Sequence, residues 1–568
     1  MEFYIERRVF RFDFVPEVPA DIRIAVGIDF GTTFSGFAYA HFHNGKVIIN
    51  ENWPGKKGPK KTPTVLQYDE DLQVLWGFDA LASEPQKKRR RKVSTNFSKP
   101  VETVELFKFY LGNTPNEQKP KLPSNVSPEK AITDYLREIG TIIKDEIKLH
   151  WPDIDFFRMV RLVVTIPAEF TEETKTIMRQ CIYNANLINN IGTQNLKFTT
   201  EPEAAAIHCM KVIKEHGLKT GASYLVVDCG GGTVDLTVRK LLPNNQLGED
   251  TERSGGYCGG SYVDKEFLKF LEKKVGKYAM KMLRDKHYGQ LSYMIQQFCE
   301  RVKTRFTGVQ SEFREYSLDI EKSCPALKQY VNGEARDELS EEEWEIEIDF
   351  LTVKSFFDPV VNKILDLIKA QLIKSKNCSL IFLVGGFSES KYLREKVMQK
   401  FENFKIAVPP YPMEAIACGA AEYGLKMDII KTRKLNHSFG VQSYSKFQLG
   451  DPPSRKTWDG RIYLFSLMAK KGVEVEVDQK FFTTMYPVYP NQTAILFKFF
   501  YTKESTAQYC DEPGMHKLGE FEVDLPDTHL GLNRPVLIQL SFGTMDIIAT
   551  AKNETNGKEY HISFELVL

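Results

Sequence analysis

Two segments far apart in the chain combine a carboxylate, glycine and threonine hydroxyls in the same order. The first runs from Asp29 to Thr33 and follows the apolar run 24–28, which reads as a buried strand. Gly31 allows a tight turn and can offer its N–H, and the hydroxyls of Thr32 and Thr33 can bond phosphate oxygens. Asp29 can hold hydrated Mg²⁺, which prefers oxygen ligands. This segment predicts a phosphate site, with a plain strand-turn corner as the alternative.

The second segment repeats this order nearer the middle of the chain. An apolar run over 224–227 is followed by Asp228, the glycines 230–232 and Thr233. Three glycines let the backbone come within hydrogen-bond reach of phosphate oxygens. Two such loops can hold one polyphosphate from both sides, so the pair predicts a nucleotide site. Two unrelated β-turns are the alternative.

A third glycine pair follows another apolar run. Gly385 and Gly386 come after 380–384 and let a flat base lie against the backbone. The stretch 415–421 then combines small residues with helical spacing, which indicates a helix that packs closely against its neighbours. Apolar strands at 160–166 and 198–200 precede Pro167 and Glu201-Pro202, and amphipathic helices are expected at 128–150, 262–308 and 350–374.

From about residue 435 the helical periodicity stops and short strands separated by turn signals begin. Asp459-Gly460, Lys471-Gly472 and Asn556-Gly557 are such turn signals. Strands at this spacing predict an all-β sandwich. The expected strands are 462–468, 473–477, 493–501, 519–523, 536–542, 547–551 and 560–566.

Composition excludes several classes of function. The 76 basic and 75 acidic residues give a net charge of +1, which offers no support for nucleic-acid binding. Nine cysteines without a CxxC pair argue against zinc and against a disulfide framework. No apolar run reaches the roughly 20 residues of a membrane span. We therefore expect a cytoplasmic protein.

Two basic or aromatic segments have open interpretations. The run Lys87–Lys92 is compatible with a nuclear import signal or an anion patch, and a solvated loop is the alternative. In the N-terminal extension, 1–23, Phe10, Phe12 and Phe14 alternate with charged residues, as in a strand.

The order of the motifs resembles the actin/hexokinase/DnaK ATPase superfamily. Within it, Ile28–Ser35 and Glu201–Ala206 resemble the 70 kDa heat shock proteins, and Val384–Ser390 with the β-only ending resembles their divergent subfamily 12, the 12A/12B-like proteins. The resemblance covers about residues 24–568.

This resemblance implies an α/β, two-lobed, actin-like ATPase domain of duplicated ribonuclease-H-like lobes, followed by an all-β sandwich without a helical lid. The nucleotide-binding domain would span 24–430 and the substrate-binding-like β domain 431–568. Lobe I would cover about 24–220, lobe II about 221–405, and a return helix 412–430.

The resemblance also implies ATP or ADP, Mg²⁺ and K⁺ as ligands, and a role for each site residue. Asp29 and Asp228 would hold magnesium through water, and Asp235 would lie near the monovalent ion. Lys108 would meet the γ-phosphate, and Glu201 would orient the surroundings of the attacking water; taken alone, these are a surface lysine and a turn carboxylate. Lys108, Glu201 and Asp228 are the implied catalytic residues, and the implied nucleotide-binding residues are Gly31, Thr32, Thr33, Phe34, Gly230, Gly231, Gly232, Thr233, Glu300, Lys303, Gly385, Gly386 and Phe387.

The sequence departs from the chaperone pattern on the base side and at the interdomain join. Glu300 and Lys303 are kept on one helix face, but Thr304 and Phe306 replace an arginine and a leucine. We therefore expect weaker or differently shaped adenine binding. Glu389 stands where an adenine-stacking arginine is usual, Met413 replaces an aspartate, and 428–434, which reads as a helix running on, replaces the apolar linker.

Three functions follow from these observations. The first is an ATP-binding, slowly hydrolysing chaperone-like protein whose β domain binds client or partner proteins, with co-chaperones as further partners. The second is a nucleotide-gated scaffold with little ATPase activity that docks one specific partner. A sugar kinase is a poor fit, because such enzymes need an aspartate base aimed at the sugar hydroxyl. The client, hydrolysis rate and oligomeric state stay open.

Overall fold

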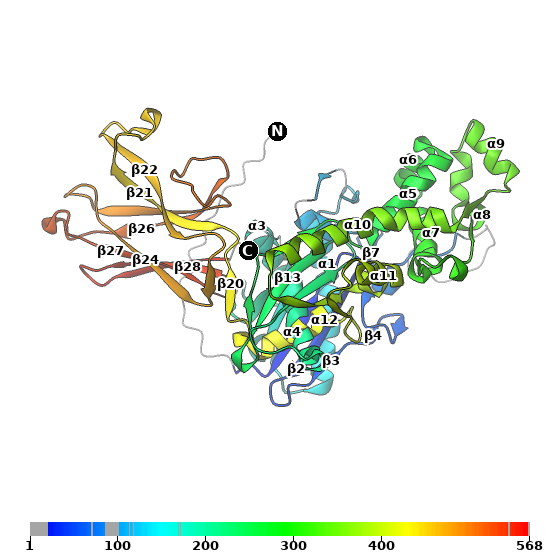
Figure 1. Cartoon of the computed structure of the whole chain (residues 1–568), viewed down its shortest axis with the longest axis horizontal. Coiled ribbons are helices and arrows are strands. Elements are labelled where there is room, and N and C mark those ends of the chain that lie inside the picture. The colour runs from blue at the N-terminus through cyan, green and yellow to red at the C-terminus, as the bar shows by residue number, and fades with distance from the viewer. Residues whose placement is uncertain are drawn as a thin grey trace.

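The computed structural model describes residues 21–69, 72–85, 102–112, 114–116, 119–167, 170, 172–543 and 546–565. The chain forms an elongated molecule, with an all-β part at one end, two α/β lobes in the middle and a helical projection at the other end (Figure 1). The aromatic segment around Phe12 and the basic run Lys87–Lys92 lie outside the described residues. Within the described ranges, no helix is long and apolar enough to cross a membrane.

The first lobe is a six-stranded sheet centred on β1 (Ile24–Asp29), the strand expected from the apolar run. All six residues of β1 are buried, because helices cover both faces of the sheet. β1 pairs antiparallel with β2 and parallel with β10. The path is β11-β10-β1-β2-β3, with β6 on β2; these strands span Leu196–Thr200 (β11), Val160–Ile166 (β10), Phe34–His41 (β2), Val47–Ile49 (β3) and Thr62–Pro63 (β6).

The second lobe repeats the first strand for strand. Its central strand, β12 (Ser223–Cys229), pairs antiparallel with β13 and parallel with β18. Since the order and directions match those around β1, the two sheets are copies of one topology, and both loops of the repeated motif leave equivalent central strands. The path is β14-β13-β12-β18-β19, with β15 on β13: Gln246–Glu249 (β14), Val234–Leu242 (β13), Cys378–Val384 (β18), Lys405–Ala407 (β19) and Ser254–Gly256 (β15).

A small-residue helix, α12 (Ala415–Leu425), packs against β1 and against α4 (Glu201–Ile213). A Cβ on Gly419 would lie 1.7 Å from the carbonyl oxygen of Ala204, so only glycine permits this approach. The close packing expected from the sequence is therefore present. The other helices and strands of lobe I are α1 (Pro128–His150), α2 (Phe156–Met159), α3 (Glu172–Asn184), β4 (Asn52–Trp53), β5 (Lys56–Lys57), β7 (Val65–Tyr68), β8 (Val74–Trp76) and β9 (Glu102–Glu105).

The helical projection and α10 share one large apolar core with lobe II. α10 (Phe350–Lys374) has the expected bounds and carries its apolar face into this core. The other elements are α5 (Ser261–Val275), α6 (Lys277–Lys286), α7 (Tyr288–Arg301), β16 (Tyr316–Asp319), α8 (Ile320–Ser323), α9 (Glu334–Glu341), β17 (Glu345–Ile348) and α11 (Lys391–Lys400).

The C-terminal part contains two four-stranded antiparallel sheets, β22-β21-β25-β26 and β24-β27-β28-β29. Residues of both sheets, such as Phe499 and Ile538, belong to one buried core. The seven expected strands are present, and β21 and β24 were not expected. The bounds are β21 Ser438–Lys446, β22 Arg461–Ala469, β23 Glu474–Glu476, β24 Gln479–Met485, β25 Ala494–Thr502, β26 Met515–Asp524, β27 Val536–Phe542, β28 Asp546–Asn553 and β29 Glu559–Glu565.

The join between the two parts corrects one expectation. Residues 428–434 do not continue the helix: α12 ends at Leu425, and β20 (Thr432–Lys434) is a strand. β20 pairs antiparallel with β23, and Ile430 bridges to Leu247 of lobe II. This pairing holds 432–434 in an extended conformation, and Arg433 on the strand reaches a buried ion cluster around Glu203.

Candidate functional site

The first loop is a tight turn fixed by its own hydroxyl groups. The Gly31 N–H donates to Ser35 Oγ (3.1 Å), so this amide serves the turn rather than facing outward as expected. Thr64 donates from its backbone N–H to the Thr33 carbonyl (2.8 Å) and from Oγ1 to the Gly31 carbonyl (2.9 Å). The sequence interpretation missed Thr64. Its contacts hold the loop rigidly at the end of β1.

The second loop lies directly against the first. A Cβ built on Gly231 would lie 2.2 Å from Thr33 Oγ1, and one on Gly232 would lie 2.8 Å from Thr32 Oγ1. The two glycine and hydroxyl segments therefore converge across the lobes. Residues 259–261, at the start of α5, hold the second loop from behind: the carbonyls of Gly230, Gly231 and Gly232 accept from the backbone N–H of Gly260 (3.0 Å), Ser261 (2.8 Å) and Gly259 (3.2 Å).

The third loop approaches Asp228. β18 runs parallel to β12 with Val384 opposite Asp228, so Gly385 follows at the same sheet edge. Gly385 has φ +82°, and a Cβ there would lie 2.3 Å from Asp228 Oδ1. Glycine is required both for this backbone conformation and for the space beside the carboxylate.

Lys108 and Glu201 form a buried ion pair. Lys108 lies in a 3-10 helix (Phe107–Leu111), and its Nζ donates to Glu201 Oε1 at 2.5 Å. Their side chains are 6% and 8% exposed, so the lysine is not the surface residue of the alternative interpretation. Glu201 opens α4 rather than ending the preceding strand. Burial raises the pKa of Glu201, and the Lys108 charge partly offsets this.

A second buried lysine, Lys61, was missed by the sequence interpretation. Its Nζ donates to Asp29 Oδ2 at 2.5 Å, with side chains 9% and 3% exposed. Burial acts to lower the pKa of Lys61, but the carboxylates of Asp29, Asp228 and Glu414 together raise it. No sequence signal separates Lys61 from the other lysines of the basic loop 52–62, because all lie outside any apolar period.

The carboxylates around Asp228 fit a bound cation. Burial first, and then Glu201, Asp235 and Asp29, raise the pKa of Asp228 well above its usual value. Asp228 Oδ1 is buried and has no hydrogen-bond partner among the described residues. Four carboxylates here face the two ammonium groups of Lys61 and Lys108, which leaves an excess of negative charge when all are ionised. A divalent ion held through water would balance that excess.

The residues expected to bind the adenine base do not converge as closely as the residues of the phosphate loops. Lys303 donates to Asp264 at 2.7 Å, and Glu300 is exposed. Phe387 is buried against Gly260, and Phe306 belongs to the apolar core, so neither ring is a free stacking surface. The structure also places the other residues implied by the resemblance. The Met413 methyl group lies 3.3 Å from a Cβ built on Gly386, and Phe34 is 43% exposed. Thr233 ends the second loop, and Asp235 lies opposite Asp228 in the pairing of β12 with β13.

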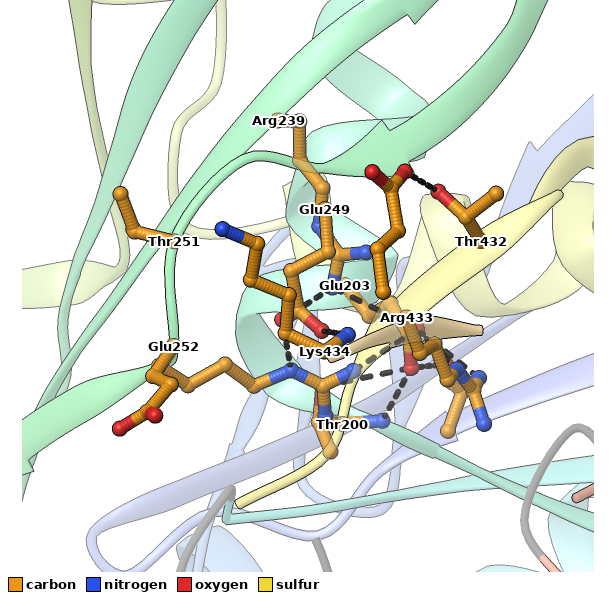
Figure 2. Close-up of polar contacts among 12 residues, drawn as sticks. Thr200, Glu203, Arg239, Glu249, Thr251, Glu252, Thr432, Arg433 and Lys434 are labelled. Carbon is orange, nitrogen blue, oxygen red and sulfur yellow. Dashed lines mark hydrogen bonds and ion pairs between the residues drawn. The ribbon is translucent and has the colours of Figure 1, made fainter. Parts of the chain in front are cut away.

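A fully buried ion cluster joins this region to β20. Glu203 Oε1 accepts from Arg433 (2.8 Å), Arg253 (3.1 Å) and Arg239 (3.4 Å). Figure 2 shows Arg433 and Arg239 beside Glu203. Burial acts to raise the pKa of Glu203, but the three guanidinium groups hold it well below its usual range. Sequence reasoning missed this cluster, because its members come from four separated segments.

Comparisons with known proteins agree with the geometry of the two lobes. The family model described as Hsp70 protein matches residues 25–433. Human heat shock 70 kDa protein 12A is 24% identical over an alignment that covers 96% of this chain and 91% of the relative. Human heat shock 70 kDa protein 12B is 23% identical over 96% of this chain and 92% of the relative. The resemblance to subfamily 12 is confirmed, and the chain belongs to the Hsp70 family.

Proposed function

We propose that the chain binds ATP between its two lobes and hydrolyses it slowly with Mg²⁺. Family membership supports binding of adenine nucleotide and magnesium in general. The observation that carries the proposal is the convergence of the two loops, in which Thr33 of lobe I lies against Gly231 of lobe II. Threonine hydroxyl groups of lobe I and glycine backbone of lobe II can then hold one triphosphate.

The buried charges have assigned roles in this proposal. Asp29 and Asp228 hold magnesium through water, and the ion when bound neutralises the charge of the phosphates. Lys108 leaves Glu201 to bind the transferred phosphate, and Glu201 then accepts a hydrogen bond from the attacking water. This exchange is supported by the direct contact of the two side chains (2.5 Å). Asp235, beside Asp228 in the sheet, is assigned to a potassium ion.

The C-terminal β part is proposed to bind client or partner proteins in the cytoplasm, with co-chaperones as further partners. Its support is the single core shared by the two sheets, because a stable sandwich can present an edge or face to an extended peptide.

Two measurements on the full chain test the proposal. Calorimetric titration with ATP and magnesium should give heat, and thermal unfolding should shift upward, because a ligand that binds only the folded state stabilises it. If wild-type protein shows no heat and no thermal shift with ATP and magnesium, the proposed nucleotide site is refuted. Fluorescence anisotropy with labelled extended apolar peptides then tests client binding, with charge-matched polar peptides as controls.

A nucleotide-gated scaffold is the second candidate, and one observation favours it. Arg433 fixes β20 in the buried cluster around Glu203, so the strand before the β part is anchored to the nucleotide-binding lobes. A fixed β part suits a single folded partner better than many peptides. ATP binding together with no affinity for any apolar peptide would select the scaffold over the chaperone.

A further inference from the structure

The residues that directly follow Lys61 are hydrogen-bonded to the first loop and to the strand after it. Thr62 and Pro63, which follow Lys61, pair with Ser35 and Phe34 as strand β6. The next residue, Thr64, donates to the carbonyls of Gly31 and Thr33. These bonds fix the start of the Lys61 side chain relative to the turn that is proposed to hold phosphate.

The absence of a side chain at Gly36 leaves room for the Lys61 side chain. A Cβ on Gly36 would lie 2.9 Å from Lys61 Cγ, so a larger residue at Gly36 would displace the lysine stem. The stem leads the ammonium group to Asp29, where it donates at 2.5 Å, and the lysine also interacts electrostatically with Asp228. Lys61 therefore places a fixed positive charge where magnesium is expected to be held.

The neighbouring lysine points elsewhere and serves as a matched control. Lys60 Nζ lies 3.9 Å from Glu414 Oε1 and 3.4 Å from the centre of the Tyr411 ring. Its side chain is 21% exposed, against 9% for Lys61. The two lysines have the same charge and adjacent backbone positions, but only Lys61 reaches the loop carboxylate.

The positive charge of Lys61 favours contact with the phosphates of a bound nucleotide. Phosphate oxygens are strong acceptors, and an ammonium group that is already desolvated loses little on turning from a carboxylate to a phosphate. A site without such a cation would depend on magnesium to bring the phosphates close to Asp29 and Asp228. Here one of the required positive charges belongs to the protein.

We propose that Lys61 is a built-in cation of the nucleotide site, which bonds the phosphates and lets this chain bind ADP and ATP without magnesium. The inference rests on the proposed function and deepens it. Magnesium remains necessary for turnover, whereas binding does not require it.

Calorimetric titration of the full chain with ADP and with ATP, in excess EDTA and in excess magnesium, tests this inference. The wild-type dissociation constants should differ by less than about 10-fold between the two buffers. Lys61→Met should weaken binding in EDTA by about 10- to 100-fold and leave binding in magnesium much closer to wild type, because it removes a charge-assisted contact that the metal can replace. Lys60→Met should match wild type in both buffers.

The outcomes separate the inference from the function on which it rests. Wild-type binding in magnesium that disappears in EDTA overturns the inference and leaves the proposed function standing. No wild-type binding in either buffer overturns both. An equal loss for Lys61→Met in both buffers identifies a structural role and also overturns the inference. The wild-type comparison needs no variant, so it decides even if Lys61→Met fails to fold.

Discussion

Arg433, on the strand that leads into the C-terminal β part, donates to Glu203, which lies two residues after Glu201 in α4 (Nη2 to Oε1, 2.8 Å). Glu201 in turn accepts from Lys108. One helix start therefore carries the proposed catalytic carboxylate and the anchor of the interdomain strand. Any movement of α4 in response to nucleotide would act on Arg433 directly.

Glu203→Gln is expected to destabilise the whole chain. The change leaves Arg239, Arg253 and Arg433 with Glu249 as the remaining carboxylate of the cluster. Removing one partner of a buried ion cluster costs about 3–5 kcal/mol, since the other charges stay desolvated. Urea unfolding of the full chain measures this loss.

A surface pair supplies the control for Glu203→Gln. Glu559 and Lys552 lie 3.0 Å apart with side chains 68% and 48% exposed, so Glu559→Gln should cost less than about 1 kcal/mol. Equal unfolding free energies for the two variants would show that the cluster around Glu203 contributes no more than a surface pair.

The contribution of Glu203 should depend on pH in a defined direction. Because the three guanidinium groups keep the folded-state pKa of Glu203 below its ordinary value of 4.5, the stabilisation is fully present above that value. As the pH falls below 4.5, the unfolded chain takes up a proton that the folded chain does not, and the stabilisation declines. The difference in unfolding free energy between wild type and Glu203→Gln should shrink from about pH 7 to about pH 3. A difference that stays constant or grows on acidification contradicts the assigned charge state.

Apolar runs and helical periodicity predicted most elements, because burial imposes them locally. The runs before Asp29 and Asp228 are strands, and α1 and α10 have the expected bounds. The convergence of the two loops also followed from sequence, since a repeated motif at the ends of equivalent strands implies equivalent places in a duplicated fold. Gly231 and Thr33 meet for this reason.

Long-range charge pairing was not predictable from the sequence. Glu203 and Arg433 are 230 residues apart, and the residues around each give no sign of a distant partner of opposite charge. Lys61 lies in a basic loop whose other lysines are exposed or face other groups, so its burial depends on Asp29 and Gly36 in the folded chain. The strand character of β20 was missed for a similar reason, since it depends on pairing with β23, about 40 residues later in the chain.

Lys108→Met is expected to lower the rate of ATP hydrolysis on the order of 100-fold with little change in nucleotide affinity, because the lysine is assigned to charge that develops on the transferred phosphate. Single-turnover hydrolysis measures the rate, and calorimetry measures the affinity. Lys121→Met, at a lysine with a 79% exposed side chain, should match wild type. Wild-type turnover in both Lys108→Met and Asp228→Ala would refute the assigned catalytic roles.

Gly231→Ala tests the contact on which the nucleotide site depends. The new Cβ would lie 2.2 Å from Thr33 Oγ1 and 2.9 Å from Thr33 Cγ2, so the two loops must separate or Thr33 must turn. Such overpacking costs about 1–3 kcal/mol, and we expect a loss of that size in unfolding free energy together with weaker ATP binding. Gly289→Ala is the control, because nothing lies within 4 Å of a Cβ there and the residue is in α7, where alanine favours the helix.

A double-mutant cycle with Thr33→Ala isolates that contact. Alanine at Thr33 removes both atoms nearest to the new Cβ, which leaves Thr33 Cβ, 3.1 Å away. Gly231→Ala should therefore destabilise the Thr33→Ala background by less than it destabilises wild type, with a coupling of about 0.5–3 kcal/mol as found for residues in contact. Unfolding free energy is the readout, because Thr33→Ala by itself also removes a proposed phosphate ligand. Additive effects within experimental error would mean that the loops do not touch in solution, and the proposed triphosphate site between the lobes would lose its foundation.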